Sequence, residues 1–245
     1  MKKLAEISTL LLLGLILGSA ADAADGVVGG IEVACKTKTG QRIAYKTTLT
    51  IIDEAGAREE QTAQTLAFGY QVGPDRVDGR VTHPGGTLPY TFRLSRDFAF
   101  ERIIPDDPSL MREDGKYGLE EVYGPLFKQA IAFCGQRWMP GETRRIELPF
   151  PGVDANVSAK LLHVGRLYGR RAAQFEIGVT GTMGYPGGIT GEMAGSGTAW
   201  ADVETGVTLE SVMRSQALIY GHEKAPVLSH EVREERRLDQ QMSSF

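Results

Sequence analysis

Apolar and polar side chains alternate in one segment after another of this 245-residue chain, and no other feature constrains the fold as strongly. In a β-strand, a period of two places alternate side chains on opposite faces. Residues 65–72 and 43–51 both show this pattern, which predicts two antiparallel neighbouring strands. Long helical runs rich in Leu, Ala, Glu and Lys are scarce, so the sequence predicts a mainly β protein.

The order of strands and turns predicts an antiparallel, strongly curved sheet or an unclosed β-barrel, with one short helical segment packed on it (α+β). The helix is expected from Leu119 to Cys134, with Gly135 as its stop. Residues 31–36 are expected to form a hairpin with 43–51, and a strand from Glu231 is expected to end the sheet as an edge strand. A further hairpin is expected to turn at Glu204-Thr205-Gly206.

The N-terminus has the features of a secretory signal peptide. Lys2 and Lys3 precede an apolar run, and Ala21-Asp22-Ala23 places small residues where signal peptidase cleaves. A retained anchor is the alternative, but the run is less than half the roughly 20 residues of a membrane span. We therefore expect a signal peptide at 1–23, a single β-rich domain at 24–235 and a flexible tail at 236–245. The mature protein would be periplasmic or secreted, without an integral membrane segment.

The only two cysteines, Cys35 and Cys134, lie in the exported part of the chain. Because exported thiols are normally oxidised, a disulfide between them is expected, and two buried free thiols are the alternative. A catalytic cysteine is not expected, because neither one has a His or Asn in a recognisable relation to it.

The remaining composition argues against several functions. The net charge is −4 without a dense Lys/Arg tract, so no nucleic-acid partner is expected. The glycine-rich run at 191–197 lacks the following Lys and helix of a phosphate-binding loop, so it predicts turns or strand kinks and no nucleotide cofactor. The four histidines and the acidic residues Asp106, Asp107, Glu113 and Asp114 lack metal-ligand spacing, so no metal is expected. No catalytic constellation is visible, so a non-enzyme is predicted.

Two motifs between 136 and 220 carry a resemblance. Trp138-Met-Pro-Gly-Glu142 is similar to a strand-entry motif of Gly, Asp or Glu and Trp, and Gly197-Thr-Ala-Trp-Ala-Asp202-Val-Glu-Thr-Gly206 is similar to a hairpin motif ending in Thr-Gly. Both resemble exported bacterial open-β-barrel proteins of the periplasmic lipoprotein-carrier type and related families of unknown function. The resemblance implies an open, curved sheet around a plug; such motifs encode turns rather than chemistry.

These features lead to two functional hypotheses. The first is an exported, non-enzymatic binding or carrier module for an apolar or amphipathic ligand such as a lipid. It rests on aromatic residues on one-sided strands: Phe68, Tyr70, Tyr90, Phe92, Phe98, Phe100 and Phe175. An ordinary closed core is the alternative interpretation of these aromatic residues. The second hypothesis is an envelope structural or assembly protein that binds another protein through the edge of its C-terminal strand.

Overall fold

The computed structural model describes residues 29–36, 38–52, 58–83, 86–96, 100–107, 127, 130–146, 153–184, 190–220 and 226–244. These residues form strands β1 (Ile31–Val33), β2 (Arg42–Ile52), β3 (Arg58–Val72), β4 (Val77–His83), β5 (Gly86–Thr87), β6 (Tyr90–Leu94), β7 (Phe100–Pro105), β8 (Gln136–Trp138), β9 (Thr143–Ile146), β10 (Val153–Leu167), β11 (Arg170–Gly184), β12 (Thr190–Asp202), β13 (Thr208–Tyr220) and β14 (Pro226–Leu238). The signal peptide expected at 1–23 lies outside the described residues.

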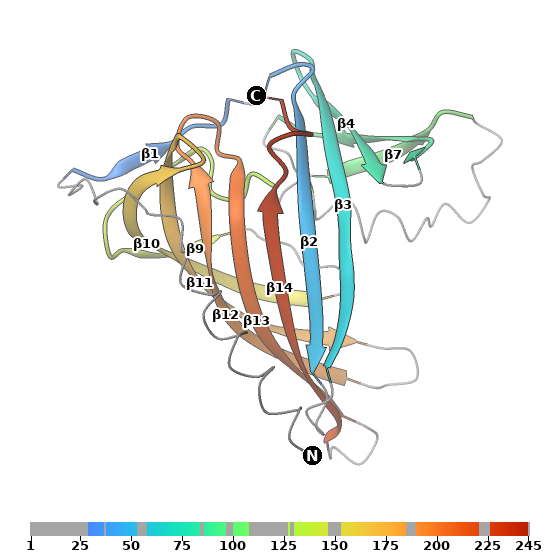
Figure 1. Ribbon diagram of the computed structural model, residues 1–245, viewed down its shortest axis with the longest axis vertical. Coiled ribbons are helices and arrows are strands. Elements are labelled where there is room, and N and C mark those ends of the chain that lie inside the picture. The colour runs from blue at the N-terminus through green and yellow to red at the C-terminus, as the bar shows by residue number, and fades with distance from the viewer. Residues whose placement is uncertain are drawn as a thin grey trace, which may run out of the picture.

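Twelve of the strands form one antiparallel sheet, which curves but does not close (Figure 1). Its order is β7-β6-β4-β3-β2-β14-β13-β12-β11-β10-β9, with β5 paired to β4. The predicted antiparallel pairing of the segments 43–51 and 65–72 is confirmed, because β2 pairs with β3. The predicted fold class, a mainly β protein with a curved, unclosed antiparallel sheet, is therefore confirmed.

The first strand does not form the predicted hairpin with β2. Instead β1 pairs with β8 in a separate two-stranded sheet, with Ile31 opposite Trp138. Ile31 and Val33 are 4% and 0% exposed and lie in the same apolar cluster as Trp138. The long-range pairing buries apolar side chains of both strands, and this burial outweighs the short connection that favoured a hairpin.

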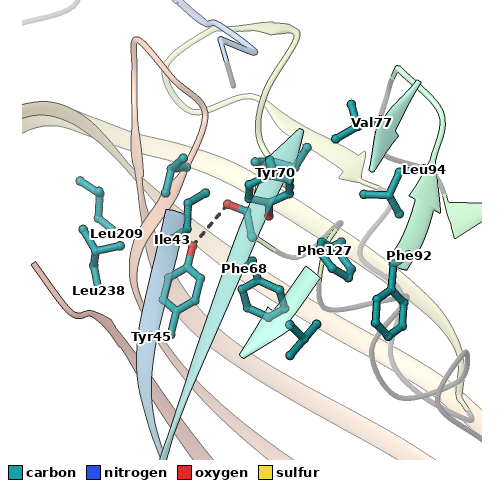
Figure 2. Packing of buried hydrophobic residues seen from close by; sticks show 14 of the residues in the cluster. Ile43, Tyr45, Phe68, Tyr70, Val77, Phe92, Leu94, Phe127, Leu209 and Leu238 are labelled. Carbon is teal, nitrogen blue, oxygen red and sulfur yellow. Dashed lines mark hydrogen bonds between the residues drawn. The ribbon is translucent and has the colours of Figure 1, made fainter. Parts of the chain in front are cut away.

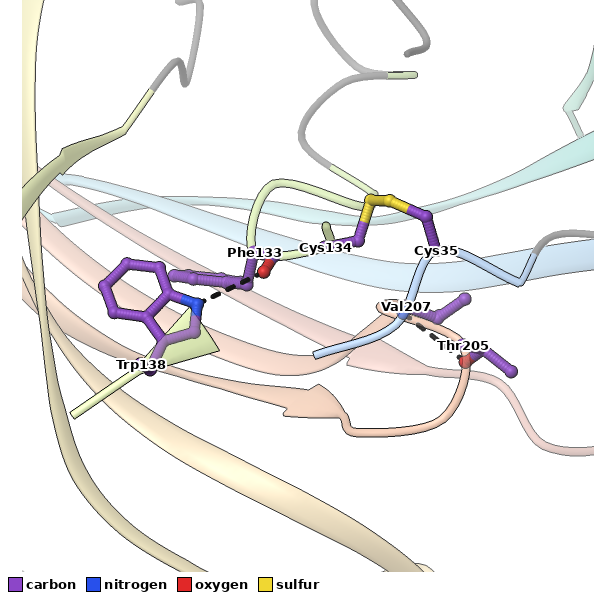
Figure 3. The surroundings of a disulfide bond; sticks show 6 residues. All are labelled: Cys35, Phe133, Cys134, Trp138, Thr205 and Val207. Carbon is purple, nitrogen blue, oxygen red and sulfur yellow. Dashed lines mark hydrogen bonds between the residues drawn. A yellow bond between two sulfur atoms is a disulfide. The ribbon is translucent and has the colours of Figure 1, made fainter. Parts of the chain in front are cut away.

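A disulfide closes the end of this small sheet, as predicted. Cys35 follows β1 and Cys134 precedes β8, with their Cα atoms 4.9 Å apart (Figure 3). The Ala34 N–H also donates to the Val203 carbonyl at 2.9 Å, so the segment is joined to the turn between β12 and β13. The disulfide therefore holds the small sheet at the same end of the molecule as that turn.

The predicted helix from Leu119 to Cys134 lies mostly outside the described residues. Phe127 is helical, whereas residues 130–135 form turns, so the predicted helical end at Cys134 is wrong. The Cys134 N–H bonds to the Ile131 carbonyl at 3.2 Å, as in a tight turn. The Gly135 N–H donates to the Val33 carbonyl, which diverts the chain into the small sheet one residue before β8.

The large sheet packs one face against Phe127, residues 130–135 and the small sheet, and we call this its inner face. Phe127 lies at the centre of an aromatic cluster (Figure 2). Its ring centroid is 5.1 Å from that of Phe68 and 5.3 Å from that of Phe92. A Cβ at Gly79 would overlap the Phe127 ring, so the glycine provides the space that this ring occupies.

The C-terminal strand is not an edge strand, and the chain after 236 is not free of the domain. Strand β14 lies between β13 and β2 and pairs with both. After β14, the Asp239 N–H donates to the Ala44 carbonyl at 2.8 Å, and Ser244 pairs with Arg42. The charges of this segment, which favoured an edge strand, pair with one another within the sheet.

Candidate functional site

The inner face has two parts, and the part against Phe127, Phe133 and Trp138 is a closed core. Phe68, Tyr70, Phe92 and Phe175 are each at most 2% exposed. The closed-core interpretation therefore holds for these four aromatic residues, and none of them is open to a ligand. Tyr90 is half-buried, Phe98 lies outside the described residues, and nothing is described of the Phe100 side chain.

Beyond this core, toward the β11–β12 and β13–β14 connections, the inner face is only half-buried. Strand register places a set of small, apolar and charged residues there. We call this set the distal inner face: Ala155, Met193, Gly195, Met213, Ser215, Val232 and Glu234. Met193 and Met213 pack against the closed core, which shows that these residues continue the same face. The distal inner face is therefore a continuation of the core that has access to solvent.

A charged pair lies where the core meets the distal inner face, with Arg236 buried and Glu234 half-buried. Arg236 is only 9% exposed, and its Nη2 donates to Glu234 Oε1 at 2.8 Å. The guanidinium also lies over the Tyr45 ring, 5.6 Å from its centroid. A charge in such a place needs a partner, since burying it alone is costly. The pair brings a cation and a carboxylate to the border of an apolar surface.

Tyr45 supports this pair from the core side. Its hydroxyl donates to the Thr208 carbonyl at 2.8 Å, so the ring is fixed beneath Arg236. Burial raises the pKa of Tyr45, and the Arg236 charge opposes that rise without cancelling it. The phenol is therefore neutral at physiological pH and acts as a hydrogen-bond donor and a cation–π surface.

The glycine run shapes the distal inner face. Gly195 and Gly197 lie inside β12. A Cβ at Gly197 would overlap the Val212 carbonyl and lie 2.5 Å from Met213 Sδ, and one at Gly195 would lie 2.7 Å from the Arg214 carbonyl. These glycines allow β12 and β13 to approach closely. The register of β12 with both neighbouring strands is unbroken across 191–197, so the turns predicted there do not form.

The hairpin motif forms a turn, as the sequence predicted. Asp202 is 1% exposed, and its Oδ1 accepts hydrogen bonds from the Glu204 N–H at 2.9 Å, the Thr205 N–H at 2.8 Å and the Thr205 hydroxyl at 2.9 Å. Its Oδ2 pairs with Arg170. Both carboxylate oxygens are therefore used in holding the β12–β13 turn.

The other candidate ligands do not converge. Within the described ranges, no three His, Cys, Asp or Glu residues are placed to hold a metal ion. His163 packs edge-on against the Trp200 ring at 5.0 Å, and Asp106 pairs with Arg80 at 2.7 Å. Glu113, Asp114 and His222 lie outside the described residues.

Comparisons with known proteins assign no family. No protein-family model matches the chain, and no curated protein matches it in sequence. None of the helical residues that the structure describes forms a segment long and apolar enough to cross a membrane.

Sequence reasoning missed Arg236 and Glu234, because they stand in a run of five charged residues that resembles a solvated tail. The signal that could have identified them is the i, i+2 spacing of opposite charges, which places both on one face of a strand. That spacing could not show which face would be buried.

Proposed function

We propose that the protein is an exported, non-enzymatic binding or carrier module that holds an amphipathic ligand against the distal inner face. The observation that carries the proposal is the change along the inner face from a closed core to a half-buried surface. A sheet face that is apolar but only partly covered is a typical place for an apolar ligand to bind.

The composition of the distal inner face favours an amphipathic ligand over a purely apolar one. Strands β10 to β12 contribute Ala155, Met193 and Gly195, which offer apolar contact and space. Strands β13 and β14 add Ser215 and Glu234, beside apolar residues. An alkyl chain would lie against the residues of β10 to β12, and the polar group of the ligand would face the residues of β13 and β14. Methionine adapts its shape to different ligands, which suits a carrier.

The test compares two neighbouring residues of β13 that face opposite ways. Ser215 is half-buried on the inner face, and Arg214 is exposed on the outer face. Ser215→Phe fills the distal inner face, and Arg214→Phe is the matched control. We expect Ser215→Phe to weaken binding of the apolar fluorophore N-phenyl-1-naphthylamine about tenfold, a loss of about 1.4 kcal/mol, while the control binds normally. Equal binding by both variants, each with an unchanged melting temperature, would contradict the proposal.

A second candidate is an envelope assembly protein that pairs with another protein through a strand edge. The observation that favours it is the short end strand β9, whose four residues pair with only Val157–Lys160 of the 15-residue β10. An edge of this kind can accept a strand from a partner. Affinity purification from the exported fraction tests it: a stoichiometric protein partner supports this candidate, and a single polypeptide counts against it.

A further inference from the structure

The charged pair of β14 has a direction, with its guanidinium toward the core and its carboxylate toward the distal inner face. Exposure rises along this side of the strand, from the buried Leu238 and Arg236 to the half-buried Glu234 and Val232. The Arg236 side chain is 10% exposed, whereas that of Glu234 is 33% exposed. Positions two apart on a strand are separated by about 7 Å, so a ligand on the distal inner face meets the carboxylate first.

The guanidinium is engaged on the core side, whereas the carboxylate has one oxygen to spare. Arg236 Nη2 donates to Glu234 Oε1 at 2.8 Å, and the guanidinium lies over the Tyr45 ring. Glu234 accepts this bond through Oε1, and within the described part of the chain no other polar group binds its side chain, so Oε2 can accept from a ligand. The pair is neutral as a whole, but the charge nearer to the distal inner face is negative.

The surroundings of this carboxylate are apolar or carry a hydroxyl. Strand pairing places Met213 directly opposite Glu234, and Ser215 opposite Val232 at the next inner position. Of the residues that define the distal inner face, Glu234 alone is charged. A carboxylate that is partly removed from water gains more from a cationic partner than one on an open surface does.

We propose that the amphipathic ligand of the distal inner face carries a protonated amine, which donates to Glu234 Oε2 while its alkyl chain runs across Gly195 toward Met193. This choice of head group rests on the proposed function, because it specifies the ligand of the same site. Ser215 is the diagonal neighbour of Glu234 across β13 and β14, and its hydroxyl can accept a second hydrogen bond from the ammonium. A carboxylate head group, such as that of a fatty acid, would be repelled by Glu234.

The experiment measures how two amphiphiles of equal carbon number displace N-phenyl-1-naphthylamine at pH 7. Decylamine is protonated at this pH, and decanoate is ionised. We expect decylamine to displace the fluorophore from the wild-type protein at an about tenfold lower concentration than decanoate. Glu234→Gln keeps the size of the side chain and removes its charge, so it should abolish this preference. Glu235→Gln is the matched control, because Glu235 is the next residue of β14, also forms an ion pair and faces outward.

A swapped pair tests the direction of the charges. Glu234→Gln leaves the buried Arg236 without a carboxylate, and the loss of one partner of a buried ion pair can unfold a protein. The double variant Glu234→Arg/Arg236→Glu keeps both charges and reverses their order along β14. Decanoate should then displace the fluorophore at a lower concentration than decylamine.

The outcomes separate this head group from the carrier function itself. A preference for decylamine that is lost in Glu234→Gln, kept in Glu235→Gln and reversed in the swapped variant supports the ammonium ligand. If the wild-type protein binds the fluorophore but decanoate displaces it equally well or better, the carrier function stands and the ammonium head group is wrong. The head group is also wrong if Glu235→Gln weakens the preference as much as Glu234→Gln, because this would indicate general attraction of amines to a protein of net charge −4. A wild-type protein that binds no fluorophore would contradict both.

Discussion

Removing the disulfide should cost about a third or more of the stability of a typical domain. The bond between Cys35 and Cys134 closes a loop with a sequence separation of 99 residues. The chain-entropy model gives about −16 cal/mol/K for such a loop, which is about 4.7 kcal/mol at 25 °C. Domains of ordinary size unfold with about 5 to 15 kcal/mol, so this one bond is a large part of the total.

The structure gives the expected loss a local component as well. Strand β1 pairs with β8 through only three residue pairs, and two further hydrogen bonds, from the Ala34 and Lys36 N–H groups, join it to the β12–β13 turn. Without the disulfide, these few bonds and the burial of Ile31 and Val33 must hold the small sheet in place. Local detachment of β1 should therefore accompany the global loss of stability.

The assay is urea unfolding of the double variant Cys35→Ala/Cys134→Ala and of the wild-type protein. With a slope of about 2 to 3 kcal/mol/M, the midpoint should fall by about 1.5 to 2.5 M. Reduced wild-type protein should match the double variant, and a reductant should leave the double variant unchanged. A loss below about 1 kcal/mol in the variant would refute the chain-entropy reasoning.

Three further predictions follow from single contacts. Gly206→Ala should destabilise the protein by about 2 to 4 kcal/mol in urea unfolding, because Gly206 has a φ of +77° and a Cβ there would overlap Cys134. Gly40 has a similar φ of +81°, but a Cβ there would meet no neighbouring atom, so Gly40→Ala should cost only about 1 kcal/mol. Asp202→Ala should lower the free energy of unfolding by about 3 to 5 kcal/mol in the same assay, because three donors of the turn and Arg170 lose their acceptor. A loss below about 1 kcal/mol would contradict this account. Burial, together with the Glu210 carboxylate, raises the pKa of Tyr168 to about 12, so the phenol ionises in the unfolded protein before it does in the folded one. The contribution of Tyr168 to the free energy of unfolding should therefore be constant below about pH 10 and fall between pH 10 and 12. Tyr168→Phe should make that fall shallower.

Local patterns predicted the elements that depend on local chemistry. The period-two runs identified most of the strands, and the Thr205-Gly206 turn follows from Asp202 and a glycine with positive φ. The disulfide followed from having only two cysteines in a chain expected to be exported. These features need no knowledge of which strands lie next to one another.

These local patterns could not predict which strands pair over long sequence distances. The sequence neighbour of β1 is β2, yet the pairing partner is β8, a hundred residues away, because burial of Trp138 decides between them. The charged residues of β14 made its position in the middle of the sheet unpredictable from the sequence. Arg236 pairs with Glu234 on the inner face, and Arg233 and Arg237 both pair with Glu235 on the outer face, so the charges of a run that seems too charged for a sheet interior have partners on each side.

The proposed carrier function is tested most directly by native mass spectrometry of the protein purified from the exported fraction, before and after extraction with organic solvent. The account predicts an added mass that extraction removes, belonging to an amphipathic molecule and absent from the Ser215→Phe variant. A bare polypeptide mass in both samples, or an added mass that Ser215→Phe retains, would contradict binding at the distal inner face.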